Sequence, residues 1–253
     1  MNPLVSIITP TFNSSSFILE TLESVRVQCF TNYEHIIVDD ASTDNTLYLI
    51  NQFIKKHNLS NIRLIRLPQN VGPAVSRNAA IKIASGRFIA FLDCDDLWKS
   101  SKLSIQINYM LSNKVPFTYS SFDIINEYGA FLKSVTVPKS IDYNGLLKSQ
   151  VIGCLTAVYD TSFFGKVYMP EIKRRQDFAL WLKLLKQVTR AHSLSPSLCC
   201  YRISSNSLSS NKFKAVFYTW LVYRRIEKLD FYRSIYFFSF YLFNSVKRYM
   251  RFP

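Results

Sequence analysis

The chain has 253 residues, of which 48% are hydrophobic, 15% are aromatic and 19% are charged. This composition excludes an intrinsically disordered protein and suffices for one sizeable core. The formal net charge of +14 leaves three classes of partner: nucleic acid, an anionic membrane surface or phosphorylated ligands. The five cysteines are odd in number and show no CxxC spacing, which favours free thiols in a reducing cytoplasm over a disulfide scaffold or a zinc site.

The first 110 residues alternate short apolar runs with segments of helical spacing. Such alternation predicts a parallel sheet with helices on both faces. Ser42 is the expected N-cap of the second helix, and Pro73 opens the third at a position where proline is tolerated. The predicted strands are 5–9, 35–39, 62–66 and 88–92, and the predicted helices are 14–27, 42–56 and 73–85.

The order of elements is mixed after residue 115. Strand-like runs occur at 116–126, 131–137 and 152–159, and a helix with an apolar face is predicted over 174–187. The most economical interpretation is one domain followed by a C-terminal extension.

Polar residues follow three of the predicted strands at the point where each strand ends. Because ligands of open α/β sheets bind beyond the carboxyl ends of the strands, these groups are expected to share one rim. An isolated Asp pair is also typical of a solvated turn or a helix cap, and this alternative stays open for Asp40. The three groups are Pro10-Thr11-Phe12-Asn13, Asp39-Asp40 and Asp93-Cys94-Asp95-Asp96.

Three carboxylates lie within the four residues 93–96. They repel one another, and a divalent cation with hard oxygen ligands, Mn²⁺ or Mg²⁺, would relieve the repulsion. The same cation would neutralise a leaving diphosphate. Cys94 is expected to be a buried spacer, because a thiolate suits a softer metal.

The first strand-to-helix turn reads TPTFNSSS and contains no glycine. A dinucleotide-binding domain would need a glycine-rich turn such as GxGxxG at this place, and a Walker A sequence is also absent. The two commonest nucleotide-binding motifs of α/β proteins are therefore excluded.

Residues 3–210 resemble the family 2 glycosyltransferases of the GT-A fold. The resemblance rests on four stretches in the family's order: VSIITPTFNSSSFILETLESV, IIVDDASTDNT, LPQNVGPAVSRNAAIKIASGRFIAFLDCDD and RRQDFALWLKLL. It implies a mostly parallel nucleotide-binding sheet flanked by helices, with a C-terminal helical extension. It divides the chain into a GT-A catalytic domain over 1–211, with a nucleotide-binding half (1–98) and an acceptor-binding half (99–211), and a basic, aromatic helical tail over 212–253.

The resemblance also implies a UDP-sugar donor site, to which the following roles belong. Asp39 would accept a hydrogen bond from the uracil ring, and Asp40 would flank it. Asp95 would bind the metal, and Asp96 is an extra acid found in some members that build bacterial surface polysaccharides. The other donor-site residues are Pro10, Thr11, Phe12 and Asn13 around the uridine, Arg77 near the uracil or diphosphate, Asp93 at the ribose, and Cys94 between the acids.

On the acceptor side, the resemblance makes Asp177 the general base. Many members have Glu where this chain has Gln176, and a helix N-cap is the alternative role for Asp177. Arg174 and Arg175 would grip acceptor phosphates or lie on the surface. Arg202 and Ser207 belong to a segment like the loop that closes over the donor diphosphate in relatives, and ordinary loop residues are the alternative.

The function implied is an inverting, metal-dependent glycosyltransferase. It would move a hexose (glucose, galactose or an N-acetylated relative) from a UDP-sugar to a lipid-diphosphate-linked saccharide in the synthesis of O-antigen or capsule. Two alternatives are a sugar-phosphate nucleotidyltransferase, which would have a glycine- and lysine-rich start, and a nucleic-acid-binding protein, suggested by the net charge. The acidic rim and the concentration of charge in the tail favour no nucleic-acid partner.

The tail carries nine Lys or Arg and two acids over residues 212–253. Its apolar stretch 234–246 is too short to span a bilayer but long enough to lie in the interface. The N-terminus lacks the basic start and long apolar run of a signal peptide. We therefore expect a cytoplasmic protein attached peripherally to the inner face of the cell membrane, the alternatives being a helical pair packed on the catalytic domain or a homodimer contact.

Overall fold

The computed structural model describes residues 2–203 and 212–250. Its centre is a ten-stranded sheet with the strand order β3-β2-β1-β4-β9-β6-β10-β5, to which β7 is added beside β6 and β8 beside β10. The strands are β1 (Val5–Thr11), β2 (Tyr33–Asp39), β3 (Ile62–Arg66), β4 (Phe88–Phe91), β5 (Leu97–Trp98), β6 (Phe117–Ile125), β7 (Phe131–Val135), β8 (Ser140–Ile141), β9 (Val158–Asp160) and β10 (Ala191–Arg202).

The first four strands are mutually parallel, as the sequence predicts. In the second half of the sheet β9 runs antiparallel to both β4 and β6, whereas β10 runs parallel to β6. The α-helices are α1 (Ile18–Arg26), α2 (Thr46–His57), α3 (Pro73–Ile83), α4 (Lys102–Asn113), α5 (Tyr143–Lys148), α6 (Thr161–Phe164), α7 (Gln176–Leu185), α8 (Lys212–Leu221) and α9 (Phe231–Met250).

Alternation along the buried strands decides which helices cover each face. In β1, Ile8 packs into the cluster that includes α3 and α7, and Ile7 packs into the cluster that includes α4. In β2, Ile37 faces the cluster formed by α1 and α2. Successive side chains of a strand point to opposite faces, so α3 and α7 lie on one face and α1, α2 and α4 on the other. The predicted sheet with helices on both faces is thereby confirmed.

Two local predictions were wrong. The second helix begins at Thr46 instead of residue 42, because the backbone N–H of Ser42 donates to Asp39 and the Ser42 hydroxyl accepts from the backbone of Asn13. The segment 152–159 is largely a short 3₁₀ helix (η1, Cys154–Thr156) followed by β9, since Thr156 bonds back to the Gly153 carbonyl.

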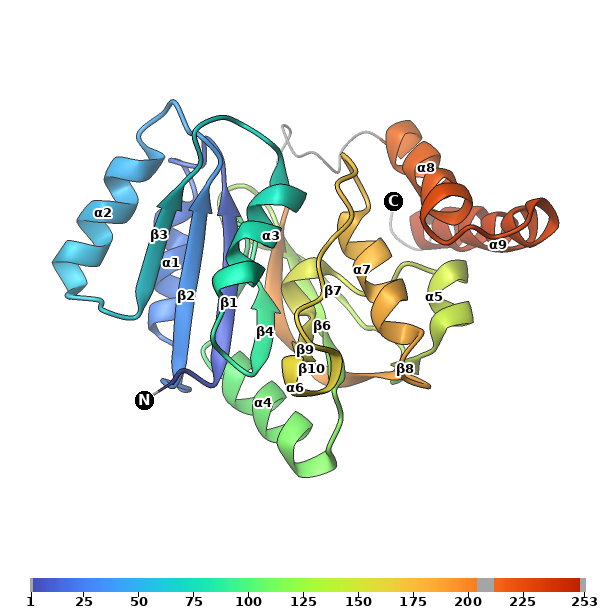
Figure 1. Cartoon of the computed structure of the whole chain (residues 1–253), viewed down its shortest axis with the longest axis horizontal. Coiled ribbons are helices and arrows are strands. Elements are labelled where there is room, and N and C mark those ends of the chain that lie inside the picture. The colour runs from blue at the N-terminus through green and yellow to red at the C-terminus, as the bar shows by residue number, and fades with distance from the viewer. Residues whose placement is uncertain (1, 204–211, 251–253) are drawn as a thin grey trace.

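The C-terminal helices lie beside α5 and α7, at the end of the molecule opposite to α2 (Figure 1). A π-helical segment, η3 (Val222–Ile226), joins the end of α8 to the turn before α9. Val222, Tyr223 and Phe237 are buried in the same cluster as residues of the central sheet, so the alternative in which the tail helices pack on the rest of the chain is observed. In the described part of the chain no helix is both long and apolar enough to cross a bilayer.

Candidate functional site

The three polar groups predicted to share a rim do so. β1, β2 and β4 are parallel neighbours, so their carboxyl ends lie at one edge of the sheet. Thr11, the last residue of β1, is the register partner of Asp39, the last residue of β2. The acidic residues 93–96 follow β4 on the other side of β1. The rim therefore places the candidate nucleoside and metal residues around the end of β1.

Asp39 is fully buried at this rim. Its Oδ2 accepts a 3.0 Å hydrogen bond from the backbone of Ser42 and lies 3.9 Å from Arg66 Nε. Its Oδ1 is buried and has no hydrogen-bond partner among the described residues. A buried acceptor without a partner is costly, so this atom fits a donor from a ligand, such as a ring N–H of a nucleobase.

Asp40 has a different environment from its neighbour. Its Oδ1 accepts from the backbone N–H of Val71 at 2.9 Å and its Oδ2 from that of Gly72 at 2.8 Å. Gly72 has a φ of 90°, a conformation that favours glycine, and it directly precedes α3. Both carboxylate oxygens of the buried Asp40 thus fix the loop into α3. These bonds favour the turn alternative for Asp40, and its contact with the nucleoside stays a prediction.

The four residues Pro10 to Asn13, at the end of β1, also differ from one another in exposure and hydrogen bonding. Pro10 and Thr11 are buried in the strand, and Phe12 is 44% exposed. Asn13 has a φ of 46°, and its Oδ1 accepts a 2.9 Å hydrogen bond from the backbone of Thr43. Phe12 is therefore the residue of this group with an open face for a planar base.

Arg77 on α3 forms an ion pair with Asp93 at the start of the acidic segment. Burial alone would lower the pKa of Arg77, but the negative charge of Asp93, and more weakly that of Asp177, raises this pKa above its ordinary value. The Nε of Arg77 is buried without a partner among the described residues. Arg77 therefore keeps one donor for a ligand and lies within electrostatic reach of the predicted base.

Cys94 fits the spacer prediction. Its thiol lies 2.9 Å from the Ser14 hydroxyl, and its carbonyl accepts a 2.9 Å hydrogen bond from Thr21. Burial, followed by the charge of Asp95, raises the pKa of the Cys94 thiol to about 12. The thiol is therefore neutral and unsuited to bind a hard cation.

Asp95 is half-buried, and no side chain of the described residues donates a hydrogen bond to its carboxylate or pairs with it. Burial, followed by the charge of Asp93, raises the pKa of Asp95 to about 6. In the described ranges no three His, Cys, Asp or Glu side chains form a closed metal site. The residues fit a cation of the Mg²⁺ or Mn²⁺ type, which is held by one or two carboxylates and completes its shell with substrate phosphates and water.

Asp96 is buried and turned into the protein. Its Oδ1 accepts a 2.9 Å hydrogen bond from the backbone N–H of Arg202. Burial, followed by the charges of Asp95 and Asp93, raises the pKa of Asp96 well above its usual range. Asp96 thus links the acidic segment to the end of β10, and its contact with the donor stays a prediction.

Arg202 ends β10 with a side chain that is 1% exposed. Its guanidinium donates to the Asp95 carbonyl at 2.8 Å, to the Glu127 carbonyl at 3.0 Å and to Glu20 Oε2 at 2.6 Å. It also lies 4.8 Å from the centre of the Phe17 ring. These three hydrogen bonds favour a structural role for Arg202, and its contact with the donor diphosphate stays a prediction. Ser207, the other candidate in this segment, lies outside the described residues.

The predicted acceptor residues surround the start of α7. Asp177 is half-buried in its first turn, and Gln176 donates a 3.3 Å hydrogen bond to the Lys173 carbonyl. Arg175, with a φ of 66°, is the N-cap residue and donates from Nη2 to the Tyr241 hydroxyl at 3.1 Å. Arg174 is half-buried beside it. Asp177 does not cap the helix, because no such bond from its side chain is formed in the described residues.

Sequence reasoning missed three residues of this region. Cys154 is buried near Arg77, Asp93 and Asp177, as their combined influence on its raised pKa after burial shows. Glu20 pairs with Arg202, and Tyr241 contacts Arg175. Neither Cys154 nor Glu20 carries a local signal, because each meets its partner only through the fold. Tyr241 lies in the tail that was expected to be an appended segment.

Comparison with known proteins agrees with the fold of this chain. The family model of glycosyl transferase family 2 matches residues 6–166. TuaG of Bacillus subtilis, a glycosyltransferase assigned to teichuronic acid biosynthesis, is 42% identical over 247 residues, 97% of either chain. WfgD of Escherichia coli, named a UDP-Glc:alpha-D-GlcNAc-diphosphoundecaprenol beta-1,3-glucosyltransferase, is 41% identical over 86% of this chain and 84% of its own. The structure of Staphylococcus aureus TarS 1–349 with UDP-GlcNAc superposes with a TM-score of 0.73 at 22% identity, over 94% of this chain and 71% of that one.

Proposed function

The chain belongs to glycosyl transferase family 2, and we propose that it transfers a hexose from a UDP-sugar to a saccharide carried on a lipid diphosphate, with inversion at the anomeric carbon. The observation that carries this proposal is that the unpartnered Oδ1 of Asp39 and the carboxylate of Asp95 lie at the carboxyl ends of β2 and β4, the strands on either side of β1, at one edge of the sheet. Asp177, at the start of α7, is close enough to Arg77 to raise its pKa, and Arg77 pairs with Asp93 of the same acidic segment. The name of WfgD supports the UDP-glucose donor and the lipid-diphosphate acceptor. The DXDD subtype and a role in surface polysaccharide synthesis form part of the same proposal.

The donor would bind along the rim in the order base, diphosphate, sugar. Asp39 Oδ1 would accept from the uracil ring, and the exposed face of Phe12 would stack against it. Arg77 would add its free Nε–H and positive charge near the sugar diphosphate. Asp95 would hold Mn²⁺ or Mg²⁺, which supplies positive charge to the leaving diphosphate.

Asp177 would accept the proton of the attacking acceptor hydroxyl. The hydroxyl oxygen then forms a bond to the anomeric carbon, while the bond from that carbon to the diphosphate oxygen breaks and UDP departs. A single displacement inverts the anomeric configuration.

The tail would place the enzyme at its acceptor. On α9, Tyr232 is 84% exposed and Phe243 65% exposed, although Phe237 is buried against the catalytic half. An outward aromatic face with nearby basic residues is typical of a helix that lies in a membrane interface. We propose that this aromatic side of α9 attaches the protein peripherally to the cytoplasmic face of the membrane. The domain division belongs to the same proposal: 1–98 is the nucleotide-binding half, 99–211 the acceptor-binding half and 212–253 the attached tail.

The test combines purified protein, Mn²⁺, a panel of UDP-sugars and a GlcNAc-diphosphate-lipid analogue. Asp95→Ala should abolish transfer and weaken UDP binding, whereas Asp177→Asn should lower kcat by about 10²-fold or more and leave UDP binding intact. The exposed Glu171, a few residues before α7, provides a matched control as Glu171→Gln. Normal transfer by the Asp177→Asn enzyme would refute the assignment of the base.

Membership in glycosyl transferase family 2 argues against the nucleotidyltransferase alternative. The nucleic-acid alternative predicts salt-dependent binding of duplex DNA or RNA. Such binding together with no binding of UDP would count against the proposal.

A further inference from the structure

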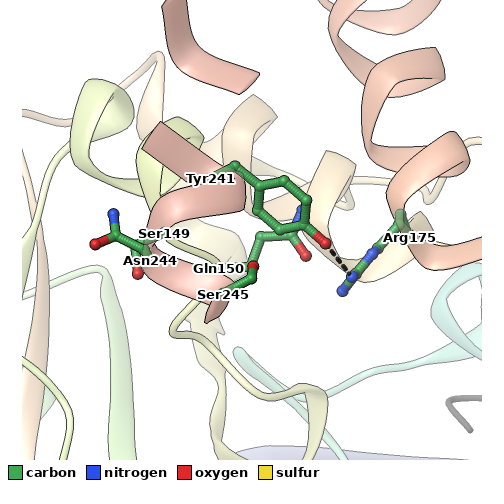
Figure 2. Close-up of a pocket in the computed structure, with 6 residues that line it drawn as sticks. All are labelled: Ser149, Gln150, Arg175, Tyr241, Asn244 and Ser245. Carbon is green, nitrogen blue, oxygen red and sulfur yellow. Dashed lines mark hydrogen bonds between the residues drawn. The ribbon is translucent and has the colours of Figure 1, made fainter. Parts of the chain in front are cut away.

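A small polar cavity lies where α9 meets the acceptor-binding half, at the start of α7. Figure 2 shows its lining, with the Arg175 guanidinium directed at the Tyr241 hydroxyl. Its volume is about 80 Å³, whereas a single water needs roughly 10–15 Å³. The cavity can therefore hold a group larger than one water. The lining residues are Ser149, Gln150, Arg175, Tyr241, Asn244 and Ser245.

We propose that this cavity binds a phosphate of the lipid diphosphate that carries the acceptor saccharide. This inference rests on the proposed function, since it names the part of the acceptor that the tail helix recognises. The acceptor-binding half and α9 would build the site together. The tail would therefore contribute to substrate binding as well as to attachment at the membrane.

The chemistry of the lining favours an anion. It consists of one guanidinium, three hydroxyls and two amides, and contains no carboxylate. Arg175 Nε is buried without a hydrogen-bond partner in the described parts of the chain. The Tyr241 hydroxyl accepts from Arg175 and so retains its own proton to donate. A phosphate oxygen would receive both the Arg175 Nε–H and the Tyr241 proton, in the charge-assisted geometry that arginine supplies to phosphates.

The walls of the cavity are fixed by further hydrogen bonds. Asn244 of α9 donates to the Lys148 carbonyl at 3.0 Å, and Gln150 donates to Thr219 of α8 at 3.1 Å. Arg175 itself has a φ of 66°, a left-handed conformation that is unfavourable for a residue with a side chain. These contacts hold the groups in place before a ligand arrives, which lowers the entropic cost of binding.

Position favours a lipid-borne phosphate over a free one. The helix that lines the cavity with Tyr241 and Asn244 exposes Phe243 and Val246 on another side. In a membrane-bound enzyme, that apolar side would lie at the interface, and the cavity would lie close to the layer that holds lipid phosphates. Arg175 is also only two positions before Asp177, so a phosphate bound there would bring the acceptor saccharide to the base.

The test uses the full chain with its donor site saturated by UDP and Mn²⁺. A short-chain alkyl diphosphate without sugar, kept below its micelle concentration, is titrated calorimetrically. Arg175→Gln is expected to weaken its binding about tenfold or more, because a charge-assisted hydrogen bond is lost. Tyr241→Phe, which preserves shape and folding, should weaken it severalfold. Lys183→Gln, which removes an exposed cation from the same helix α7, should leave it unchanged.

Three outcomes decide the proposal. Equal affinity of the wild type and both cavity variants for the alkyl diphosphate would overturn it. Inorganic pyrophosphate that binds as tightly as the alkyl diphosphate would overturn the lipid source. Weaker binding of the alkyl diphosphate by both cavity variants would support the cavity assignment. If the enzyme also transfers no sugar to any lipid-diphosphate saccharide, that second result would refute the proposed function and leave the cavity assignment standing.

Discussion

The backbone N–H of Arg202 donates a 2.9 Å hydrogen bond to the Asp96 carboxylate across 106 positions of the chain. The Arg202 guanidinium also holds the Asp95 carbonyl at 2.8 Å. The end of β10 thereby fixes two consecutive residues of the acidic segment. The orientation of the Asp95 carboxylate, the candidate metal ligand, depends on this connection.

Replacing Arg202 should therefore affect metal use more than the chemical step. Arg202→Lys keeps the charge near Glu20 but loses the fork that reaches the Asp95 and Glu127 carbonyls. We expect the Mn²⁺ concentration for half-maximal activity to rise about tenfold, with a smaller fall in kcat at saturating metal. Metal titrations of initial rates measure both.

Glu20→Gln is the matched control for the ion pair alone. Because Glu20 is half-exposed, its loss should cost about 1 kcal/mol or less of unfolding free energy and should change the metal requirement little. If Arg202→Lys needs no more Mn²⁺ than the wild type, Arg202 does not position Asp95.

Asp39 and Asp40 are adjacent carboxylates with opposite expected phenotypes. Asp40→Asn places an amide N–H₂ or a single oxygen against two backbone donors, so the unfolding free energy should fall by about 1–3 kcal/mol. Asp39→Asn keeps a polar group of equal size but loses the charged acceptor for uracil, so the Kd for UDP should rise about tenfold with a smaller loss of stability. Chemical denaturation and UDP titration of both variants measure the two effects. The reverse pattern would contradict the assignment.

The pattern of the sequence was sufficient for the first four strands and the three helices between them. These strands are buried runs separated by amphipathic helices, and parallel connections place their carboxyl ends together, so the rim at Thr11, Asp39 and Asp93 followed from local periodicity. The helix α4 and the short strand β5 were not predicted. β5 consists of Leu97–Trp98, and only its pairing with Cys199 and Cys200 makes it a strand.

The division of labour within the acidic and polar groups required the fold. Nothing in the sequence around Asp40 or Asp96 shows that their carboxylates bind backbone N–H groups, because the donors come from Gly72 and Arg202, far along the chain. Charge alone made each acid equally suited to a ligand. Burial and partners separate Asp39 and Asp95 from the other two.

His35 predicts how stability depends on pH. It is fully buried, its Nε2 lies 2.8 Å from the Thr9 hydroxyl, and burial lowers its pKa from 6.5 to about 3. Between pH 6.5 and 3 the unfolded chain binds a proton at this residue that the folded chain does not, so this contribution is fully present above pH 6.5 and is lost as the pH falls. Protonation of His35 in the unfolded chain should lower the free energy of unfolding by up to about 1.4 kcal/mol for each unit by which the pH falls within this range.

His35→Gln retains a polar contact to Thr9 without the titration. Urea unfolding of this variant from pH 7 to 5 should show a flatter decline of stability than the wild type. His57→Gln, on the half-buried histidine of α2, should keep the wild-type slope. If the free energy of unfolding of all three proteins declines with the same slope between pH 7 and 5, folding does not lower the pKa of His35.

The packing of the tail determines how its proposed membrane attachment can be tested. Deleting residues 213–253 would remove Val222 and Tyr223 from the main core, so a truncated chain would report misfolding as well as lost binding. Phe243→Ser with Val246→Ser changes only exposed side chains of α9. Since burying such a side chain contributes about 1.5–3 kcal/mol, co-sedimentation with anionic phospholipid vesicles should weaken at least tenfold. The matched control is Tyr128→Ser with Phe131→Ser, two exposed aromatics near β7, which should sediment like the wild type. If the α9 variant instead keeps vesicle binding but changes from dimer to monomer in analytical ultracentrifugation, the exposed face of α9 contacts a second copy of the chain and not the membrane.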